Sequence, residues 1–360
     1  MSQPLAVIGV PTSAGAFAPG QEQAPAALRN AGLLEMLSEA GIATRDDGDR
    51  PVWRWRPDRA NRRAQNLGAV VEIVGETARR VGTAVAAGEA TLVLGGDCTV
   101  GIGAVAGHVA RGRERVGVIY FDSHADLNVP SSVHEGALDW MRMAHMLGED
   151  GAAAELVAAG GRTPLLEAGQ VVLLGWGPDQ ATAFERAAIA RRGLSVVVVD
   201  QVAADPEAAA LEARRLISES CDHFIVHFDV DVIDFTDTPL SENWGRNEGV
   251  SYEQAMRALR VLLAAPSLAG LTITELNPDH TEDEETVKRF TKAISRRWLK
   301  RRRSDVSAAD RLRHGTTRAR RAGAACASPL GYASLAPRTA NAPEAAAERP
   351  SRGWEPYSAL

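Results

Sequence analysis

The amino-acid sequence predicts an α/β protein, a three-layer αβα sandwich in which a mainly parallel sheet lies between two layers of helices. Two observations support this fold class. Short apolar runs alternate with Ala-rich stretches of helical length over residues 1–299. Most of these runs are continuously apolar, as expected for strands that are buried on both faces. Strands and helices that alternate in this way are typical of a parallel sheet covered on both sides.

The expected elements follow from the same pattern. The apolar runs predict strands at Leu5–Val10, Thr91–Leu94, Val116–Phe121, Val171–Leu174, Ser195–Val199, His223–Phe228 and Leu268–Thr274. The stretches between them predict helices near residues 25–40, 66–88, 100–111, 137–148, 179–192, 206–219, 251–264 and 282–298. An open parallel sheet binds its ligands at the carboxyl ends of the strands, so functional residues are expected there.

The segment after residue 299 has a different composition. Lys300–Arg303 opens a stretch rich in Ala, Arg, Pro and Ser, in which only a short helix near Ala308–Arg313 is expected. We predict one domain over residues 1–299 and a mostly disordered basic tail over residues 300–360. The tail carries 12 basic and 5 acidic residues, a net charge of +7, which leaves −13 for residues 1–299.

The composition argues against several classes of protein. A net charge of −6 disfavours a protein built to coat nucleic acid, and a basic run such as the tail is usually solvated. The three cysteines, Cys98, Cys221 and Cys326, form no disulfide framework and suit a reducing cytoplasm. No apolar run reaches the roughly 18 residues of a membrane helix, and no secretory signal is visible. We therefore expect a cytoplasmic protein with neither a membrane nor a nucleic-acid partner.

Four polar clusters follow expected strands. They are Gly95-Gly96-Asp97-Cys98, Asp122-Ser123-His124-Ala125-Asp126-Leu127-Asn128, Asp229-Val230-Asp231 with Asp234 beyond it, and Glu275-Leu276-Asn277-Pro278. Side chains two residues apart on an extended strand end point to the same face. Asp122, His124 and Asp126 can therefore converge, and so can Asp229 and Asp231.

Clustered carboxylates and an imidazole in a partly buried site require a compensating cation. Mixed ligands of this kind suit Mn²⁺, with Zn²⁺, Fe²⁺ and Ni²⁺ as alternatives. The ligands are more numerous than one ion needs, which favours a pair of ions about 3.5–4 Å apart. An isolated Asp-x-His or Asp-x-Asp is more often a turn or a solvated loop. Two such motifs directly after buried strands favour a metal site.

Taken together, the four clusters resemble the patterns of the arginase–agmatinase, or ureohydrolase, family. Those patterns are Gly-Gly-Asp-His, Asp-Ala-His-x-Asp, Ser-x-Asp-x-Asp-x-x-Asp-Pro and Glu-x-Asn-Pro. The resemblance covers residues 5–298, and Ile8–Pro11 with Ala24–Arg29 is closer to arginase than to agmatinase. The family implies a three-layer αβα domain with two Mn²⁺ ions at the carboxyl edge of the sheet. It also implies that metal-bound hydroxide attacks a guanidinium carbon and releases urea.

The resemblance assigns roles by position. It implies that Asp122 and Asp229 bridge the metals, that His124 and Asp231 complete the second site, and that Asp126 belongs to the first. Glu275 matches the carboxylate that holds the guanidinium group, and Asn128 matches a contact to the substrate's α-carboxylate. Asp97 and Asp234 are expected to orient the ligands.

Cys98 stands where the family has a histidine ligand of the first metal. A thiolate is a soft ligand that matches Zn²⁺ or Fe²⁺ better than Mn²⁺. Cys98 is therefore either a ligand or a small buried residue. In both cases the first site is weakened, and one firmly held ion is an alternative to two. The family also includes single-manganese members with Cys at this position, which hydrolyse Nω-hydroxy-L-arginine.

The substrate side departs from the family as well. Aligned without gaps, Asp139 falls where arginases keep a proton-shuttling histidine, and Glu135 falls where they keep a serine near the α-carboxylate. His134 could take over the shuttle, or it is a surface histidine. The resemblance also implies that Asn243, in Glu242-Asn243-Trp244, occupies the loop where arginases place small residues beside the guanidinium group.

The resemblance implies a metal-dependent amidinohydrolase that converts a guanidino compound, arginine-like or Nω-hydroxyarginine-like, to urea or a urea derivative and an amine. The alternative is a catalytically impaired protein that retains the ureohydrolase fold for binding or assembly. The resemblance also implies a homo-oligomer, a trimer or a hexamer.

Overall fold

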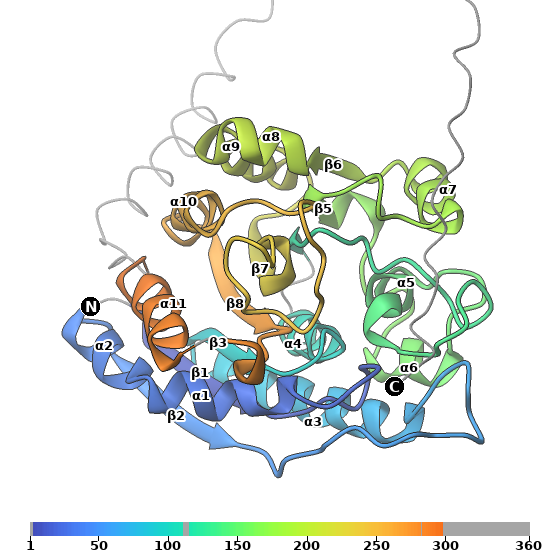
Figure 1. The fold of residues 1–360 in the computed structure, drawn as a ribbon, viewed down its shortest axis with the longest axis horizontal. Coiled ribbons are helices and arrows are strands. Elements are labelled where there is room, and N and C mark those ends of the chain that lie inside the picture. The colour runs from blue at the N-terminus through green and yellow to red at the C-terminus, as the bar shows by residue number, and fades with distance from the viewer. Residues whose placement is uncertain (1–2, 111–114, 282, 298–360) are drawn as a thin grey trace, which may run out of the picture. The chain divides into compact units, whose positions relative to one another are not determined.

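A computed structural model describes residues 3–110, 115–281 and 283–297. Within these ranges eight parallel strands form one sheet, in the order β2-β1-β3-β8-β7-β4-β5-β6 (Figure 1). The strands are β1 (Leu5–Val10), β2 (Thr44–Asp49), β3 (Ala90–Gly95), β4 (Val116–Phe121), β5 (Val171–Trp176), β6 (Ser195–Val198), β7 (His223–Asp229) and β8 (Leu268–Thr274). This arrangement confirms the predicted α/β class and the parallel sheet.

The expected strands are all present, and β2 is an additional one. Its sequence, Thr-Arg-Asp-Asp-Gly-Asp, is polar and most of its residues are exposed, so no apolar run predicts this strand. It pairs with β1 at the edge of the sheet. Ion pairs connect it to the rest of the domain: Arg45 contacts Glu89 at 2.8 Å, and Arg80 contacts Asp47 at 3.0 Å. Charged side chains thus replace apolar packing in this strand.

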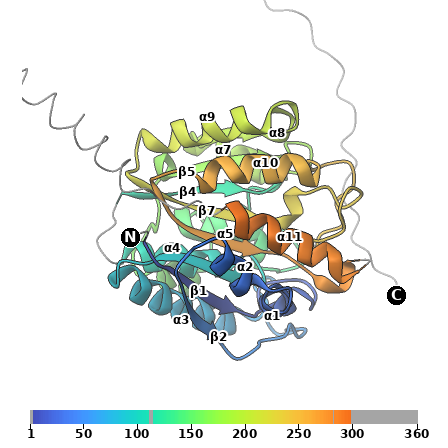
Figure 2. The ribbon, with the colours of Figure 1, turned by 90° about the vertical axis from the view of Figure 1, so that its left-hand side faces the viewer.

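Helices cover both faces of the sheet (Figure 1). One face is covered by α1 (Ala24–Asn30), α2 (Leu33–Glu39), α8 (Val199–Ala204), α9 (Pro206–Ser218), α10 (Tyr252–Leu263) and α11 (Glu284–Arg297). The other face is covered by α3 (Leu67–Ala86), α4 (Val100–Val109), α5 (Arg142–Leu147), α6 (Ala154–Ala159) and α7 (Ala183–Arg192). Figure 2 shows α10 beside α9 along the first face.

The core has two parts because the side chains of each strand alternate between the faces. In β1, Leu5 and Val7 pack with the first set of helices, whereas Ala6 and Ile8 pack with the second set. All four side chains are fully buried. A buried Leu or Ile side chain contributes about 1.5–3 kcal/mol, so this double burial anchors the central strands.

Several helix boundaries differ from the prediction. The helix expected over residues 25–40 is divided into α1 and α2 at Gly32, whose φ of 88° no ordinary helical residue adopts. The helix expected near residues 137–148 begins as a 3₁₀ turn, η2 (Asp139–Met141). The helix expected from residue 179 begins at Ala183, where the Thr182 side chain caps it. The short helices α6 and α8 were not anticipated.

The predicted basic tail and its short helix lie outside the described residues, as does Cys326. Cys98 and Cys221 are buried free thiols. Within the described ranges, no helix combines the length and the apolar character that a bilayer crossing requires.

Candidate active site

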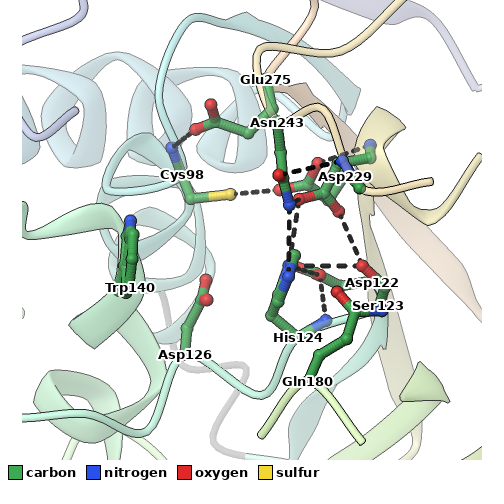
Figure 3. A network of polar contacts seen from close by, with 12 residues as sticks. Cys98, Asp122, Ser123, His124, Asp126, Trp140, Gln180, Asp229, Asn243 and Glu275 are labelled. Atoms are coloured by element: carbon green, nitrogen blue, oxygen red, sulfur yellow. Dashed lines mark hydrogen bonds and ion pairs between the residues drawn. The ribbon is translucent and has the colours of Figure 1, made fainter. Parts of the chain in front are cut away.

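Four adjacent strands in the middle of the sheet present the polar clusters at one edge. Cys98 follows β3, Glu275 follows β8, Asp229 ends β7 and Asp122 follows β4, and these strands are neighbours in the order β3-β8-β7-β4. The register pairs Asp229 with Thr274 of β8. The parallel sheet therefore brings together residues that are far apart in the sequence, as Figure 3 shows.

Asp122, His124 and Asp231 form one group of convergent ligand atoms, which we call the second ligand group. The His124 Nδ1 atom lies 3.0 Å from Asp231 Oδ2. It lies 3.3 Å from Asp122 Oδ1, and Figure 3 shows these two side chains next to each other. Asp231 sits in a 3₁₀ turn, η4 (Val230–Val232), and its backbone N–H donates to the Asp229 carboxylate at 2.9 Å. The Asn243 amide nitrogen lies 3.3 Å from His124 Nε2 and so borders the same group.

The electrostatics of this group favour a cation. Burial alone would lower the pKa of His124, but the Asp231 and Asp122 carboxylates raise it well above its usual value. Burial, and then the charge of Asp231, raise the pKa of Asp122. In the protein alone, a proton on His124 therefore compensates the carboxylates. A divalent ion can take the place of that proton because carboxylate and imidazole are its usual ligands.

Cys98, Asp122, His227 and Asp229 form the other convergent group, the first ligand group. All four side chains are buried. The Cys98 thiol donates to Asp229 Oδ2 at 2.7 Å (Figure 3). Its sulfur also lies 3.4 Å from His227 Nε2. Burial, followed by the charge of Asp229, raises the pKa of Cys98 well above its usual value. The free protein therefore keeps Cys98 as a thiol.

Sequence reasoning missed His227. It stands at the serine of the Ser-x-Asp-x-Asp pattern, and the two-residue spacing to Asp229 places both on one face of β7. That departure from the pattern was the available signal. His227 Nε2 lies 2.9 Å from Thr274 Oγ1, and its ring stacks on Tyr120 with centroids 5.0 Å apart.

Asp126 lies outside both ligand groups of the described residues. Its backbone has a φ of 49°, so the chain leaves the extended path at this residue. The Tyr120 hydroxyl donates to its carboxylate. In Figure 3 the Asp126 side chain stands apart from the dashed network. Its predicted role as a ligand stays a prediction.

Glu275 is buried and fixed on both oxygens. Its Oε1 accepts from the Cys98 backbone N–H at 2.7 Å, and its Oε2 accepts from the Gln21 side chain at 3.0 Å. Burial, followed by the charges of Asp139 and Asp97, raises its pKa well above the usual value. Gln21 is fully buried, and its Oε1 has no hydrogen-bond partner among the described residues. Nothing in the sequence singled out Gln21.

The two shuttle candidates lie in different environments. Asp139 is buried, and burial, followed by the charge of Asp97, raises its pKa well above the usual value. His134 is exposed on the preceding loop, where its backbone N–H donates to the Glu135 carboxylate at 3.2 Å. Asn128 is buried, and its side-chain oxygen accepts from Ser132 and Thr182.

The residues expected to orient the site bind loops rather than the ligand groups. Asp97 accepts from the backbone N–H groups of Gly15 and Thr99, both at 3.0 Å. Asp234 accepts from the N–H groups of Glu248 and Thr236, both at 2.8 Å. These contacts hold the loops that follow β3 and β7 and border both ligand groups.

The chain is similar to arginases in both sequence and structure. The Arginase family matches residues 3–298. An arginase of Bacillus caldovelox is 30% identical over 287 residues, which cover 79% of this chain and 94% of that protein. Arginase-1 of Homo sapiens is 28% identical over 298 residues, or 80% and 89% of the two chains. The solved structure of the Bacillus caldovelox arginase superposes with a TM-score of 0.74, covering 83% and 98% of the chains.

Proposed function

Because the chain belongs to the arginase family, we propose that it is a metal-dependent amidinohydrolase that releases urea or a urea derivative from a guanidino compound. One observation carries this proposal. The second ligand group, which suits a divalent ion, lies at the same sheet edge as Glu275, a buried carboxylate that suits a guanidinium group. The family supports the reaction class, and the residues of the site support its application to this chain.

Asp122, His124 and Asp231 are the residues that would hold the ion, with Asp229 beside them. Mn²⁺ is the expected ion by family, and Zn²⁺, Fe²⁺ or Ni²⁺ would also accept these ligands. A bound ion of this kind supplies a water nucleophile that is ionised near neutral pH. His124 must then be neutral, so ion binding displaces the proton that its neighbours otherwise hold there.

Glu275 and Gln21 would bind the guanidinium group. A guanidinium group is planar and carries only donors, so it needs acceptors at fixed positions. Glu275 supplies the negative charge, and the free carbonyl oxygen of Gln21 supplies one further acceptor. The Gln21 amide nitrogen keeps the Glu275 carboxylate in place before the substrate binds. Such preorganisation reduces the entropy that binding must offset.

The substrate would be arginine-like or Nω-hydroxyarginine-like. Asn128 is positioned by its own hydrogen bonds, as expected of a residue that contacts the α-carboxylate. Glu135 lies on the same loop and would repel such a carboxylate. A guanidino compound without a free carboxylate therefore belongs among the substrates to test.

Asp139 is our candidate for the residue that delivers a proton to the leaving amine. Its buried carboxyl group holds a proton at a pH where an exposed aspartate has lost it. His134 is the weaker candidate because it is exposed.

The test is a screen for urea and hydroxyurea. Purified protein is loaded separately with Mn²⁺, Fe²⁺, Zn²⁺ and Ni²⁺ and incubated with arginine, Nω-hydroxyarginine, agmatine and other guanidines. Release of either product that depends on added metal would support the proposal. If no ion and no guanidine gives product, the alternative of an impaired ureohydrolase-fold protein is favoured. In that case a Cys98→His, Asp139→His double variant should gain the activity that the parent lacks.

The proposal extends to the setting of the enzyme. We expect a homo-oligomer, a trimer or a hexamer, and a location in the cytoplasm, both by analogy with the family. Sedimentation of the purified protein tests the first expectation, and fractionation of cells tests the second.

A further inference from the structure

Arg142 is an unusual residue beside the first ligand group. Its side chain is fully buried in α5, and its Nε and Nη2 atoms have no hydrogen-bond partner among the described residues. Nη1 donates to the Cys98 carbonyl oxygen at 3.4 Å. A buried guanidinium keeps its charge and is costly unless negative groups surround it. The acidic sheet edge provides such surroundings.

The guanidinium group lies next to the imidazole of His227. A Cβ atom on Gly101 would lie 2.3 Å from Arg142 Nη1 and 3.0 Å from His227 Nδ1, so both nitrogens border the same space. Tyr120 contacts both groups: the Arg142 guanidinium carbon lies 4.0 Å from its ring centroid, and the His227 ring stacks on it. A side chain at position 101 would therefore have to displace the Arg142 guanidinium from its present place.

This arrangement selects one tautomer of His227. Its Nδ1 atom has no hydrogen-bond partner among the described residues and borders a group that can only donate. A proton on Nδ1 would face the positive guanidinium, so the lone pair belongs there and the proton belongs on Nε2. Nε2 lies 2.9 Å from Thr274 Oγ1 and 3.4 Å from Cys98 Sγ, both of which can accept.

To bind a metal through Nε2, neutral His227 would have to carry its proton on Nδ1 instead, where that proton would face the Arg142 guanidinium. The first ligand group therefore loses its only imidazole, although its atoms converge. Its remaining members are the shared Asp122, the Cys98 thiol and Asp229, which the thiol already contacts. The positive charge of Arg142 further disfavours an ion there. The first ligand group does not fit a second ion, in contrast to the two-metal pattern of the family.

We propose that Arg142 is a positioning residue that supplies the fixed positive charge at the first ligand group. Through His227 it keeps Cys98 a hydrogen-bond donor to Asp229 rather than a metal ligand, so the chain holds one divalent ion, at the second ligand group. This proposal depends on the proposed function in one respect: it assumes that the second ligand group binds an ion.

Cobalt titration of the full-length protein tests this directly. Co²⁺ bound to a thiolate gives a near-ultraviolet charge-transfer band, and dialysis with elemental analysis counts the bound ions. We expect one Co²⁺ per chain and no thiolate band in the parent protein. Two ions, or a thiolate band, in the parent would overturn the proposal and leave the proposed function intact.

Variants separate the charge of Arg142 from its bulk. Arg142→Met removes the charge, and we expect it to bind a second Co²⁺ with a thiolate band that Cys98→Ser in the same background abolishes. Arg142→Lys keeps a positive charge and should bind one ion without the band. If Arg142→Met folds, as circular dichroism will show, and still binds one ion without a band, the proposal is wrong.

The tautomer of His227 provides a test that needs no Arg142 variant. Nitrogen chemical shifts of ¹⁵N-histidine-labelled protein, assigned by the signal lost in His227→Gln, distinguish the two tautomers. We expect the proton on Nε2, and a proton on Nδ1 would overturn the proposal even if Arg142→Met does not fold. A parent protein that binds no Co²⁺ or Mn²⁺ at all contradicts the metal-dependent function and also removes the single ion proposed here.

Discussion

The two ligand groups share Asp122 and lie at one sheet edge, yet their surroundings differ. The second group is partly open, with the His124 side chain 28% exposed, and it contains no cationic residue other than His124. The first group is enclosed, contains a thiol, and is bordered by the guanidinium group of Arg142. Strand order explains why both groups converge. The residues behind them decide whether an added ion or the protein's own cation balances the carboxylates.

The largest difference is expected between two variants, each of which substitutes a ligand that belongs to only one of the groups. Asp231→Asn removes a carboxylate of the second group alone, so we expect loss of bound Mn²⁺ and a fall in urea release of about 1,000-fold. Cys98→Ser alters the first group alone and should retain the ion. Elemental analysis and a urea assay check both variants. Loss of the ion in Cys98→Ser with retention in Asp231→Asn would reverse the comparison.

Glu275→Gln tests whether the carboxylate that would bind the guanidinium group acts separately from both ligand groups. The variant keeps the shape and removes the charge that would pair with a guanidinium group. We expect kcat/KM to fall about 100-fold, the cost of an unpaired buried charge, with the metal content unchanged. Asp279→Asn, an exposed acid on the same loop, is the matched control and should change kcat/KM less than about twofold. A fall in metal content in Glu275→Gln would instead make Glu275 part of a ligand group.

Variants of Asp139 and His134 test whether the proton donor for the leaving amine is buried or exposed. We expect Asp139→Asn to lower kcat by roughly 50-fold with little change in KM, and His134→Asn to change kcat less than about twofold. Because burial and Asp97 raise the pKa of Asp139, activity should fall as the pH rises through that value and the carboxyl group loses its proton. A pH–rate profile of each variant measures this, and a high-pH limb that persists in Asp139→Asn would exclude the role.

The raised pKa of His124 predicts how the second group responds to pH. Below that pKa the ion must displace a proton, so Mn²⁺ affinity should rise about tenfold per pH unit and then level off above it. Calorimetric titrations at several pH values from about 6 to 8 measure the slope. An affinity that is independent of pH would mean that the ion does not bind the His124 imidazole.

Gln21→Leu should have the smallest effect. It removes the hydrogen bond to Glu275 and the free carbonyl oxygen, so we expect KM to rise about five- to tenfold with kcat nearly unchanged. Gln23→Leu is the control, because Gln23 lies two residues away and binds the exposed Asp279. Both residues belong to one 3₁₀ turn, η1 (Gln21–Gln23), so equal effects of the two substitutions would show that Gln21 stabilises this turn and does not contact the substrate.

The spacing of the ligands could be read from the sequence, because Asp122, His124 and Asp231 follow buried strands. The position of Asp126 could not, since the spacing argument assumes an extended chain and the backbone turns at this residue. Contacts across the fold were also out of reach. Gln21 lies 254 residues from Glu275, and no local pattern connects them. Arg142 sits among apolar helical residues, where its burial depends on the space that Gly101 leaves.

The predicted fold was correct in the interior of the sheet and incomplete at its edge, for one physical reason. Central strands are buried on both faces and so have apolar sequences, which alternation with helices makes recognisable. An edge strand is stabilised by pairing on one side and can be polar throughout, as β2 is. Its presence follows from its neighbour β1 and from ion pairs, which the sequence pattern does not encode.

The same strand bears on how copies of the protein can associate. An open strand edge can pair with the edge of another molecule, which is a common route to aggregation. On β2 the carboxylates of Asp46, Asp47 and Asp49 lie within four residues, and ion pairs with Arg29 and Arg80 hold them against the neighbouring helices. A second copy that added its edge here would have to desolvate these charged groups, and that cost opposes a sheet that continues from one subunit to the next. Any assembly is therefore expected to use the helical surfaces, leaving the β2 edge in solvent.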